Sequence, residues 1–259
     1  MVTIEKISSS ENKMTFLLKK STPAYSNALR RIMLTQVPVM AIENIEFSKN
    51  NSALYDEVLA HRLGLTPLKT DLKSYKLWEG KKSEVPKSAQ YELKLTLNAK
   101  GPCTVFGSDL KSQDPKVVAA FEKMPIVKLL EGQEIELITT ARLGQGKEHA
   151  KFSPGLAVYK GVPELIVTKD SNVKDCLEKL SEVISKKGNG LEIKDLTNWN
   201  EANEDICESF GVEVESSKED FIFTIESWGQ LPPREIFTKA IDMFDTKLDE
   251  FQTIVKKIK

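Results

Sequence analysis

The sequence predicts an α+β protein that combines several short strands with a helix near each end of the chain. Alternating apolar residues indicate strands at 2–4 and 14–18, and further strand-like runs follow within 39–160. Helical spacing of apolar residues marks 22–34 and 237–258. With 259 residues, of which 40% are hydrophobic, the chain is long enough for two domains and a sizeable core.

The first predicted helix has clear ends and one apolar face. Thr22 suits the N-cap, Pro23 suits the first turn, and Pro38 marks where the helix must have ended. Its apolar residues recur at spacings of three and four: Tyr25, Ala28, Leu29, Ile32 and Met33. Arg30 and Arg31 lie beside this stripe, in a chain with only five arginines. Spacing alone fits a solvated helix flank as well as it fits an interface.

A second helix is predicted over 52–63, with Gly64 at its end and Pro67 shortly after. His61 and Arg62 occupy its last turn, where the helix dipole favours positive charge by ~0.3–1 kcal/mol. That effect explains both residues without any ligand. Because no cysteine or second histidine is near it in the sequence, we interpret His61 as a capping or packing residue and not as a metal ligand.

The middle of the chain divides into a β-rich segment over 39–160 and a compact insert over 161–221. The insert predicts the order β-α-β-α-β. Its first helix is expected to be capped by Asp170 or Ser171 and to continue as far as Ile184.

The last predicted helix starts after Pro232 and Pro233 and carries a heptad seam. The apolar residues of the seam follow one another at alternating steps of four and three: Phe237, Ile241, Phe244, Leu248, Phe251, Val255 and Ile258. Burying them would contribute ~1.5–3 kcal/mol each, whereas association of two proteins costs ~4–15 kcal/mol. The seam therefore supports a dimer only together with other surface. It also fits a helix that covers the sheet of its own domain.

Charge and motifs exclude several classes of function. A net charge of −1 gives no bulk attraction to nucleic acid or to an anionic membrane. The N-terminus has no signal-peptide pattern, so we expect a cytoplasmic protein. The chain has no Asp-x-Asp pair for two Mg²⁺ ions, no nucleophile elbow, no His-Glu-x-x-His and no P-loop. We therefore expect no catalytic residues in this chain.

The three cysteines, Cys103, Cys176 and Cys207, are widely separated in the sequence. They form neither a disulfide framework nor a C-x-x-C metal site. We interpret them as separate buried or surface thiols with no close pair. The sequence accordingly predicts no metal and no cofactor.

Four runs of residues match one known family. They are TPAYSNALRRIML at 22–34, HRLGLTPL at 61–68, ARLGQGKEHAK at 141–151 and FTIESWG at 223–229. Together they resemble the alpha-type subunits of RNA polymerase, most closely the archaeal D-type subunits, and the resemblance covers nearly the whole chain. It implies a discontinuous alpha-subunit-type dimerisation domain from 1–38 and 222–259, an inserted mostly-β domain over 39–160 and a ferredoxin-like insert over 161–221.

The resemblance also implies partners and contact residues. The family pairs with small subunit L, holds small subunits N and P, and receives the beta-like large subunit. Contact with DNA would be only indirect, through the complex, and no membrane is involved. Docking of the large subunit is implied for Arg30, Arg31, His61 and Arg62, with 141–151 as an interface loop. Dimerisation is implied for Tyr25, Leu29, Ile32, Phe237, Ile241, Phe244, Leu248, Phe251 and Val255.

Some archaeal D-type subunits bind an iron–sulfur cluster through four cysteines in the insert, whereas this insert has only two. The resemblance thus predicts a non-catalytic assembly platform, without a cluster, within a DNA-directed RNA polymerase, a nucleotidyltransferase. Two alternatives stay open. A eukaryotic alpha-like subunit is disfavoured because the zinc-loop cysteines of the RNA polymerase II version are absent. A ferredoxin-like electron-transfer protein would be revealed by an absorption spectrum and an iron assay.

Overall fold

The computed structural model describes residues 2–80, 84–169, 171–188 and 190–258. Two compact units make up this part of the chain. The first unit contains residues up to Ser9, Met14–Ala28 and Val158–Thr224, and the second contains Ser10–Lys13, Leu29–Ala157 and the residues from Ile225 onward. Helices and antiparallel sheets are mixed along the chain, so the predicted α+β class is confirmed.

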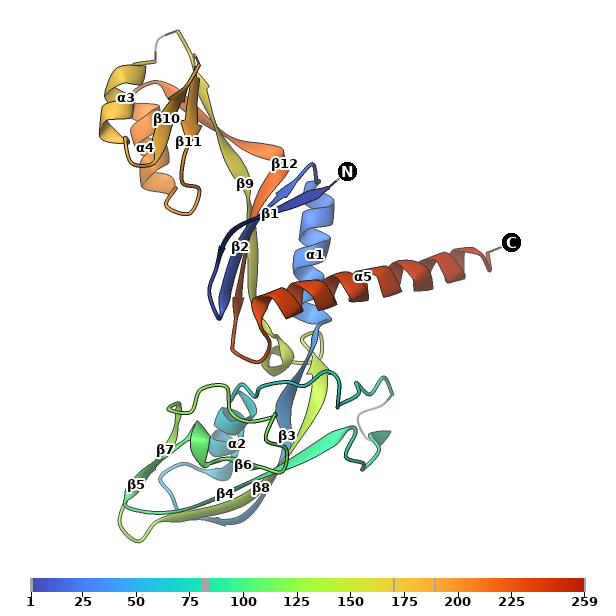
Figure 1. Cartoon of the computed structure of the whole chain (residues 1–259). Coiled ribbons are helices and arrows are strands. Elements are labelled where there is room, and N and C mark those ends of the chain that lie inside the picture. The colour runs from blue at the N-terminus through green and yellow to red at the C-terminus, as the bar shows by residue number, and fades with distance from the viewer. Residues whose placement is uncertain (1, 81–83, 170, 189, 259) are drawn as a thin grey trace. The chain divides into compact units, whose positions relative to one another are not determined.

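The first unit is built around a four-stranded sheet (Figure 1). Its strands, in the order β1-β2-β12-β9, are β1 (Thr3–Ser9), β2 (Lys13–Lys19), β12 (Val212–Ser227) and β9 (Gly155–Val167). The two predicted N-terminal strands are confirmed as β1 and β2, which pair antiparallel from Thr3 opposite Lys19. Aromatic rings fill one side of this sheet. Phe223 stacks on Phe16 with ring centroids 5.4 Å apart, and Tyr159 stacks on Phe223 at 5.2 Å.

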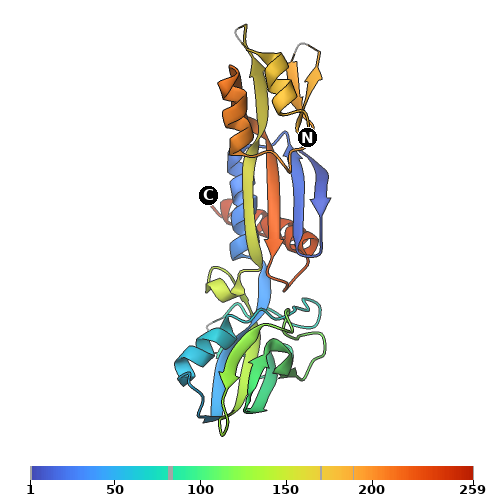
Figure 2. The ribbon, with the colours of Figure 1, turned by 90° about the vertical axis from the view of Figure 1, so that its left-hand side faces the viewer.

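The insert follows β9 and precedes β12, and Figure 2 shows its helices and strands grouped around the outer ends of those two strands. It contains α3 (Val173–Lys179), β10 (Ile184–Lys187), β11 (Gly190–Ile193) and α4 (Glu201–Ser209). The order is therefore β-α-β-β-α-β, with one strand more than predicted. The additional strand, β10, pairs antiparallel with β11 in a separate two-stranded sheet.

The expected helix to Ile184 is wrong, because α3 ends at Lys179. Ile184 is buried from a strand instead, which suits a β-branched side chain. The cap also differs from the prediction. Asn172 is the N-cap of α3, and its side chain accepts a hydrogen bond from the Asp175 N–H. Of the two predicted caps, Ser171 is not the cap residue, and Asp170 lies outside the described residues.

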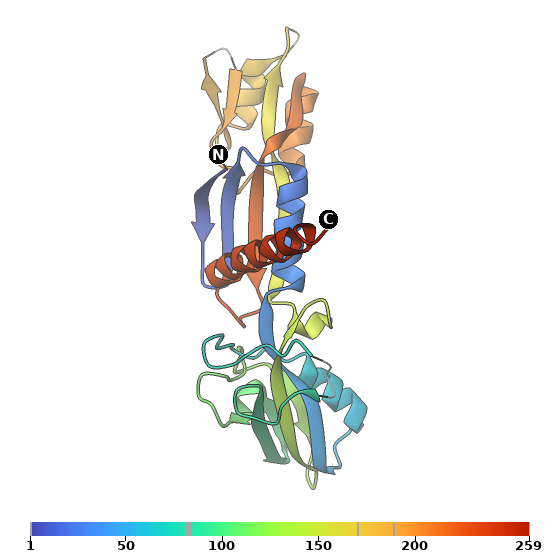
Figure 3. The same cartoon turned by 90° about the vertical axis from the view of Figure 1, so that its right-hand side faces the viewer.

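The second unit contains a four-stranded sheet, a two-stranded sheet and α2 (Asp56–Gly64). The larger sheet, in the order β3-β8-β4-β6, consists of β3 (Pro38–Asn50), β8 (Glu134–Gln145), β4 (Glu92–Lys100) and β6 (Lys111–Ser112). The smaller pairs β5 (Cys103–Phe106) with β7 (Pro125–Leu129). Figure 3 shows α2 running beside β3.

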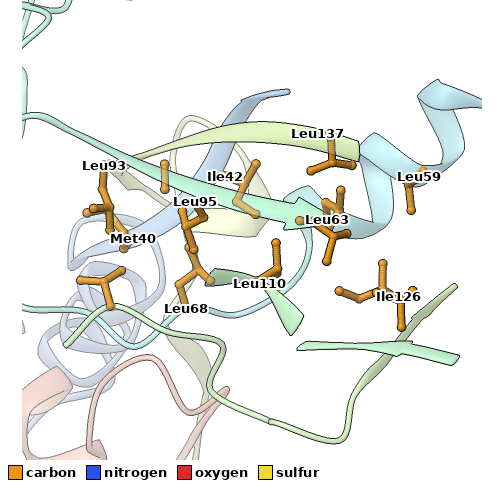
Figure 4. Packing of buried hydrophobic residues seen from close by; sticks show 14 of the residues in the cluster. Met40, Ile42, Leu59, Leu63, Leu68, Leu93, Leu95, Leu110, Ile126 and Leu137 are labelled. Carbon is orange, nitrogen blue, oxygen red and sulfur yellow. The ribbon is translucent and has the colours of Figure 1, made fainter. Parts of the chain in front are cut away.

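A dense hydrophobic core joins these elements of the second unit (Figure 4). Alternate residues of β4, namely Leu93, Leu95 and Leu97, are buried, as the alternating pattern predicts. Leu59 and Leu63 of α2 reach the same cluster and are fully buried. The strand β4 and the helix α2 are therefore held by the same set of apolar contacts.

Two further helices are α1 (Pro23–Thr35) and α5 (Pro233–Val255). The Tyr25 N–H donates to Thr22 Oγ1 at 3.2 Å, so the predicted cap is confirmed. The predicted start of the second helix at residue 52 is wrong, since α2 begins at Asp56. The Ser52 hydroxyl instead donates to Asn50 Oδ1 at 2.7 Å and stabilises the preceding turn.

The predicted domain divisions coincide with strands. Position 38 begins β3, position 160 lies inside β9 and position 221 lies inside β12. The segments on either side of each division are thus joined by continuous backbone structure and not by flexible linkers.

Candidate protein-interaction surfaces

The seam on α5 passes from covered to uncovered along the helix. Phe237, Ile241 and Phe244 are half-buried. The C-terminal seam residues and the neighbouring Ile254 together form an apolar stripe. Its side chains are exposed by 46–73%: Leu248, Phe251, Ile254, Val255 and Ile258. Figure 1 shows α5 as one unbroken helix. Four of these residues lie on α5, and Ile258 follows the end of the helix. Isolated exposed apolar residues are ordinary, but a contiguous stripe of this kind is typical of a protein-interaction site.

Another face of α5 belongs to the interior of the protein. Ile236 and Ala240 are buried, with exposed fractions of at most 1%. Heptad spacing did not select Ile236, because it precedes the first seam residue by one position. The helix therefore has a buried anchor in its first two turns and an apolar stripe left open in its last three.

The residues expected to dimerise from α1 are placed differently. Leu29 and Ile32 are buried within this chain, while Tyr25 is half-buried. The side chains of Leu29 and Ile32 already pack inside this chain. Their role in dimerisation stays a prediction. Arg31 is exposed and Arg30 is half-buried. The helix thus offers its charged flank, and not its apolar stripe, to solvent.

The second group of expected docking residues lies at the end of α2. His61 and Arg62 are both exposed. The Arg62 guanidinium nevertheless has internal partners on β7, because Nε donates to the Ile126 carbonyl at 2.7 Å and Nη2 donates to the Pro125 carbonyl at 3.0 Å. Arg62 therefore fastens α2 to β7, a role that the helix-dipole interpretation did not include.

Replacing Arg62 by alanine is expected to lower the free energy of unfolding by ~1–3 kcal/mol, because two carbonyl groups lose charged donors. Arg62→Lys should restore only part of this loss, since an ammonium cannot reproduce the planar fork. Equilibrium urea unfolding measures the effect, and His61→Ala, a change at the exposed neighbour, should stay within ~0.5 kcal/mol of the wild type. Equal losses in both variants would contradict the anchoring role of Arg62.

An apolar hollow of about 490 Å³ lies next to the residues that follow α2 in the second unit. Its rim includes Leu65, Phe121 and Trp228, each 45–49% exposed, and Gln230 lines it as well. The buried Gln230 Oε1 has no hydrogen-bond partner among the described residues. Sequence reasoning did not select Phe121 or Trp228 as surface residues. Trp228 lies in the FTIESWG run at 223–229, and the match of this run to a known family is the only feature of the sequence that points to Trp228.

The run at 141–151 is mostly not a loop. Residues through Gln145 belong to β8, whose pairing with β3 continues to Gln145 opposite Pro38. The expectation of an interface loop is therefore wrong for this half of the run, because its backbone is used in a sheet and its side chains are buried. Only a short turn and the 3-10 helix Ala150–Phe152 remain outside the strand.

A partly buried cluster of charges, centred on the buried Arg142, fixes that turn. Arg142 contacts Glu43 at 3.3 Å and Glu148 at 3.0 Å, and Lys151 contacts Glu43 at 2.6 Å. The Phe152 ring lies under both cations, with its centroid 4.9 Å from the Arg142 guanidinium carbon. Because the desolvation cost of such pairs offsets much of their attraction, they are weak evidence for net stability.

The same turn also holds the end of α1. The Lys147 N–H donates to the Thr35 carbonyl at 3.0 Å, and Gln145 Nε2 donates to the Gln36 carbonyl at 2.6 Å. Between them Gly146 approaches α1 so closely that a Cβ would overlap the carbonyl oxygen of Leu34. Only glycine allows this approach of two backbones.

The expectation of no close cysteine pair is wrong. Cys176 on α3 and Cys207 on α4 are buried with their Sγ atoms 3.8 Å apart, while Cys103 is exposed. The packing of α3 against α4 brings these two cysteines together, although they are 31 positions apart in the sequence.

Within the described ranges no three His, Cys, Asp or Glu side chains gather in a way that could hold a metal ion. Nor does any described helix have the length and apolar character needed to cross a membrane.

Comparison with known proteins defines the class to which these surfaces belong. Residues 15–248 match the RNA polymerase Rpb3/Rpb11 dimerisation domain. The DNA-directed RNA polymerase subunit Rpo3 of Archaeoglobus fulgidus is 35% identical over 262 residues, which cover 100% of this chain and 99% of that protein. The Rpo3 subunits of Thermococcus kodakarensis and Methanobrevibacter smithii are each 34% identical and cover 100% and 96% of this chain. These matches cover 99% and 96% of the two relatives.

The chain therefore belongs to the Rpb3/Rpb11 dimerisation-domain family of RNA polymerase subunits. Its full-length relatives named above are archaeal Rpo3 subunits, so the predicted resemblance to the archaeal D-type subunits is confirmed. The chain is accordingly a subunit of DNA-directed RNA polymerase and acts in transcription.

Proposed function

We propose that this chain is a non-catalytic assembly subunit that pairs with the small, Rpb11-like subunit L through α5. The observation that supports this most directly is the open apolar stripe from Leu248 to Ile258. It lies on the last turns of α5 and just beyond them, in a chain whose residues 15–248 match a dimerisation domain. A partner that covers the stripe removes an apolar surface that would otherwise face water, and burial of each side chain contributes ~1.5–3 kcal/mol.

In this proposal α1 supports the platform and its charged flank docks the beta-like large subunit. Arg31 is exposed and is therefore available to a carboxylate or a backbone carbonyl of a partner. His61 and the exposed part of the Arg62 side chain, both at the end of α2, extend the docking residues. The zinc-binding small subunits N and P would join the same platform. DNA would be contacted only by the assembled enzyme, in the cytoplasm.

The domain division proposed for this role keeps a discontinuous dimerisation domain from 1–38 and 222–259, with the β-rich segment 39–160 and the ferredoxin-like insert 161–221 placed between its halves. The hydrophobic cluster of the second unit supports the middle segment as a unit with its own core. The separate cluster around Trp199 and Val212 does the same for the insert.

Co-expression with subunit L tests the pairing. Alone, the chain is expected to self-associate or to be poorly soluble, because the α5 stripe stays open. With subunit L it should elute as a one-to-one complex, as measured by size-exclusion chromatography with light scattering. A monodisperse monomer with no affinity for subunit L would rule out this function for α5.

A further inference from the structure

Two cysteines of the insert are brought side by side by its two helices. Cys176 lies in the middle of α3 and Cys207 near the end of α4, 31 positions further along the chain. Both are fully buried in a small apolar cluster that also contains Leu180, Ile184 and Trp199. Their Sγ atoms are 3.8 Å apart, and the Cys176 thiol is placed to donate a weak hydrogen bond to Cys207.

The surroundings keep both groups as neutral thiols. Burial raises the pKa of Cys176, and it raises the pKa of Cys207 to about 12, an effect to which the nearby carboxylates of Glu204 and Glu208 add. A catalytic or metal-binding cysteine requires a thiolate, which a positive neighbour or a metal normally stabilises. While α3 and α4 are closed, both thiols are therefore unreactive, but their sulfur atoms lie close enough for a covalent link to form once the insert opens.

We propose that Cys176 and Cys207 form a reversible intrachain disulfide that joins α3 to α4. The bond length of a disulfide is ~2.05 Å, so the two sulfur atoms must approach each other by roughly 1.8 Å from their separation of 3.8 Å. The inference does not depend on the role of the chain in polymerase assembly, because the insert carries both cysteines.

The reaction is thiol–disulfide exchange with a small-molecule disulfide such as oxidised glutathione. One cysteine loses its proton and attacks the small disulfide, which forms a mixed disulfide and releases one small thiol. The second cysteine then loses its proton and displaces the other small thiol. Two cysteine thiols are oxidised, one disulfide is reduced to two thiols, and both protons pass to the departing thiolates. Because thiolate is scarce while the helices are closed, exchange must wait for opening of the insert and is therefore slow.

The link would matter most in a segment with a small core. It closes a loop of about 30 residues that contains β10, β11 and Trp199. Closing a loop of that length removes conformations of the opened state, so opening of the insert becomes rarer on the order of a hundredfold. The insert would thus exist in a looser, reduced form and a locked, oxidised form.

The test uses the full chain, incubated in buffers of reduced and oxidised glutathione, then denatured and treated with a thiol-reactive reagent. Cys176 and Cys207 should both lose their free thiols, whereas the exposed Cys103 either stays free or carries a glutathione that the peptide map identifies. Tryptic digestion should give one cross-linked species that joins residues 175–179 to 195–218. Proteolysis of the native insert should slow on the order of a hundredfold on oxidation and recover on reduction.

Two variants complete the design. Cys103→Ser should form the same cross-link and lose both of its free thiols, whereas Cys207→Ser should give no cross-linked species and show no change in proteolysis on oxidation. Since the wild-type peptide map needs no variant, poor folding of Cys207→Ser would leave the test intact. A glutathione adduct that persists on Cys176 or Cys207 in place of the cross-link, a link between chains through either cysteine, or free thiols at both in oxidising buffer would each overturn the proposal.

Discussion

Replacing Leu248 by glutamate is expected to weaken pairing with subunit L by at least a hundredfold, equivalent to about 3 kcal/mol. Leu248 lies in the open part of the α5 stripe and is half exposed in this chain, so the substitution should not disturb its own fold. In the complex the carboxylate would be buried without a partner, which costs several kcal/mol. The affinity can be measured by titration calorimetry or by pull-down with subunit L.

Glu250→Ala is the matched control on the same helix. Two positions along a helix correspond to a turn of ~200°, so Glu250 lies on nearly the opposite side from Leu248. It lines a hollow together with Gln145 and Lys147 of the same unit. Its removal should change the affinity for subunit L less than threefold. If both variants bound subunit L equally well, the partner would have to meet another face of α5.

Reversal of both arginines of α1 to glutamate is expected to leave the pair with subunit L intact and to block its incorporation into the polymerase. Reversing one partner of an interfacial charge pair typically costs ~2–5 kcal/mol. Arg31 is exposed and Arg30 half-buried, so the single change Arg31→Glu should show part of the effect without any effect on folding. Transcription by the reconstituted enzyme should fall because fewer complexes assemble.

The readouts must separate assembly from turnover. Native electrophoresis or co-purification counts assembled enzyme, and activity per assembled enzyme should stay normal. Arg234→Glu, which makes the same charge change at an exposed site on α5, should assemble normally. Normal assembly of the double variant, with a slower rate of nucleotide addition, would show that Arg30 and Arg31 do not act in docking.

Local signals predicted the elements whose formation depends on few distant contacts. Thr22 as N-cap with Pro23 after it correctly predicted the start of α1, and Pro232 with Pro233 correctly predicted the start of α5. Alternation in β4 gave its buried face. These features depend on the residues of one element and on the preference of apolar side chains for the interior, so one sequence contains enough information to find them.

The misplaced features depend on contacts between distant segments. Ile184 continues the periodicity of α3, yet it pairs with Ile193 in β10 and β11. The hydrogen bonds of Arg62 to β7 join residues 64 and 63 positions apart. The approach of Cys176 to Cys207 likewise results from the packing of two helices. No spacing rule for a single element contains such information, and tertiary packing overrides local preference at these sites.

The contact between Gly146 and the end of α1 restricts the protein in a way that neither core packing nor docking describes. A methyl group at position 146 would have to push the Leu34 carbonyl aside, and with it the last turn of the helix that carries Arg30 and Arg31. Arg30 and Arg31 would be unchanged themselves but would shift relative to β8. The absence of a side chain at position 146 therefore sets the distance between the end of β8 and the end of α1. In a library of single substitutions, replacements at position 146 should be strongly depleted, although glycine itself has no side chain.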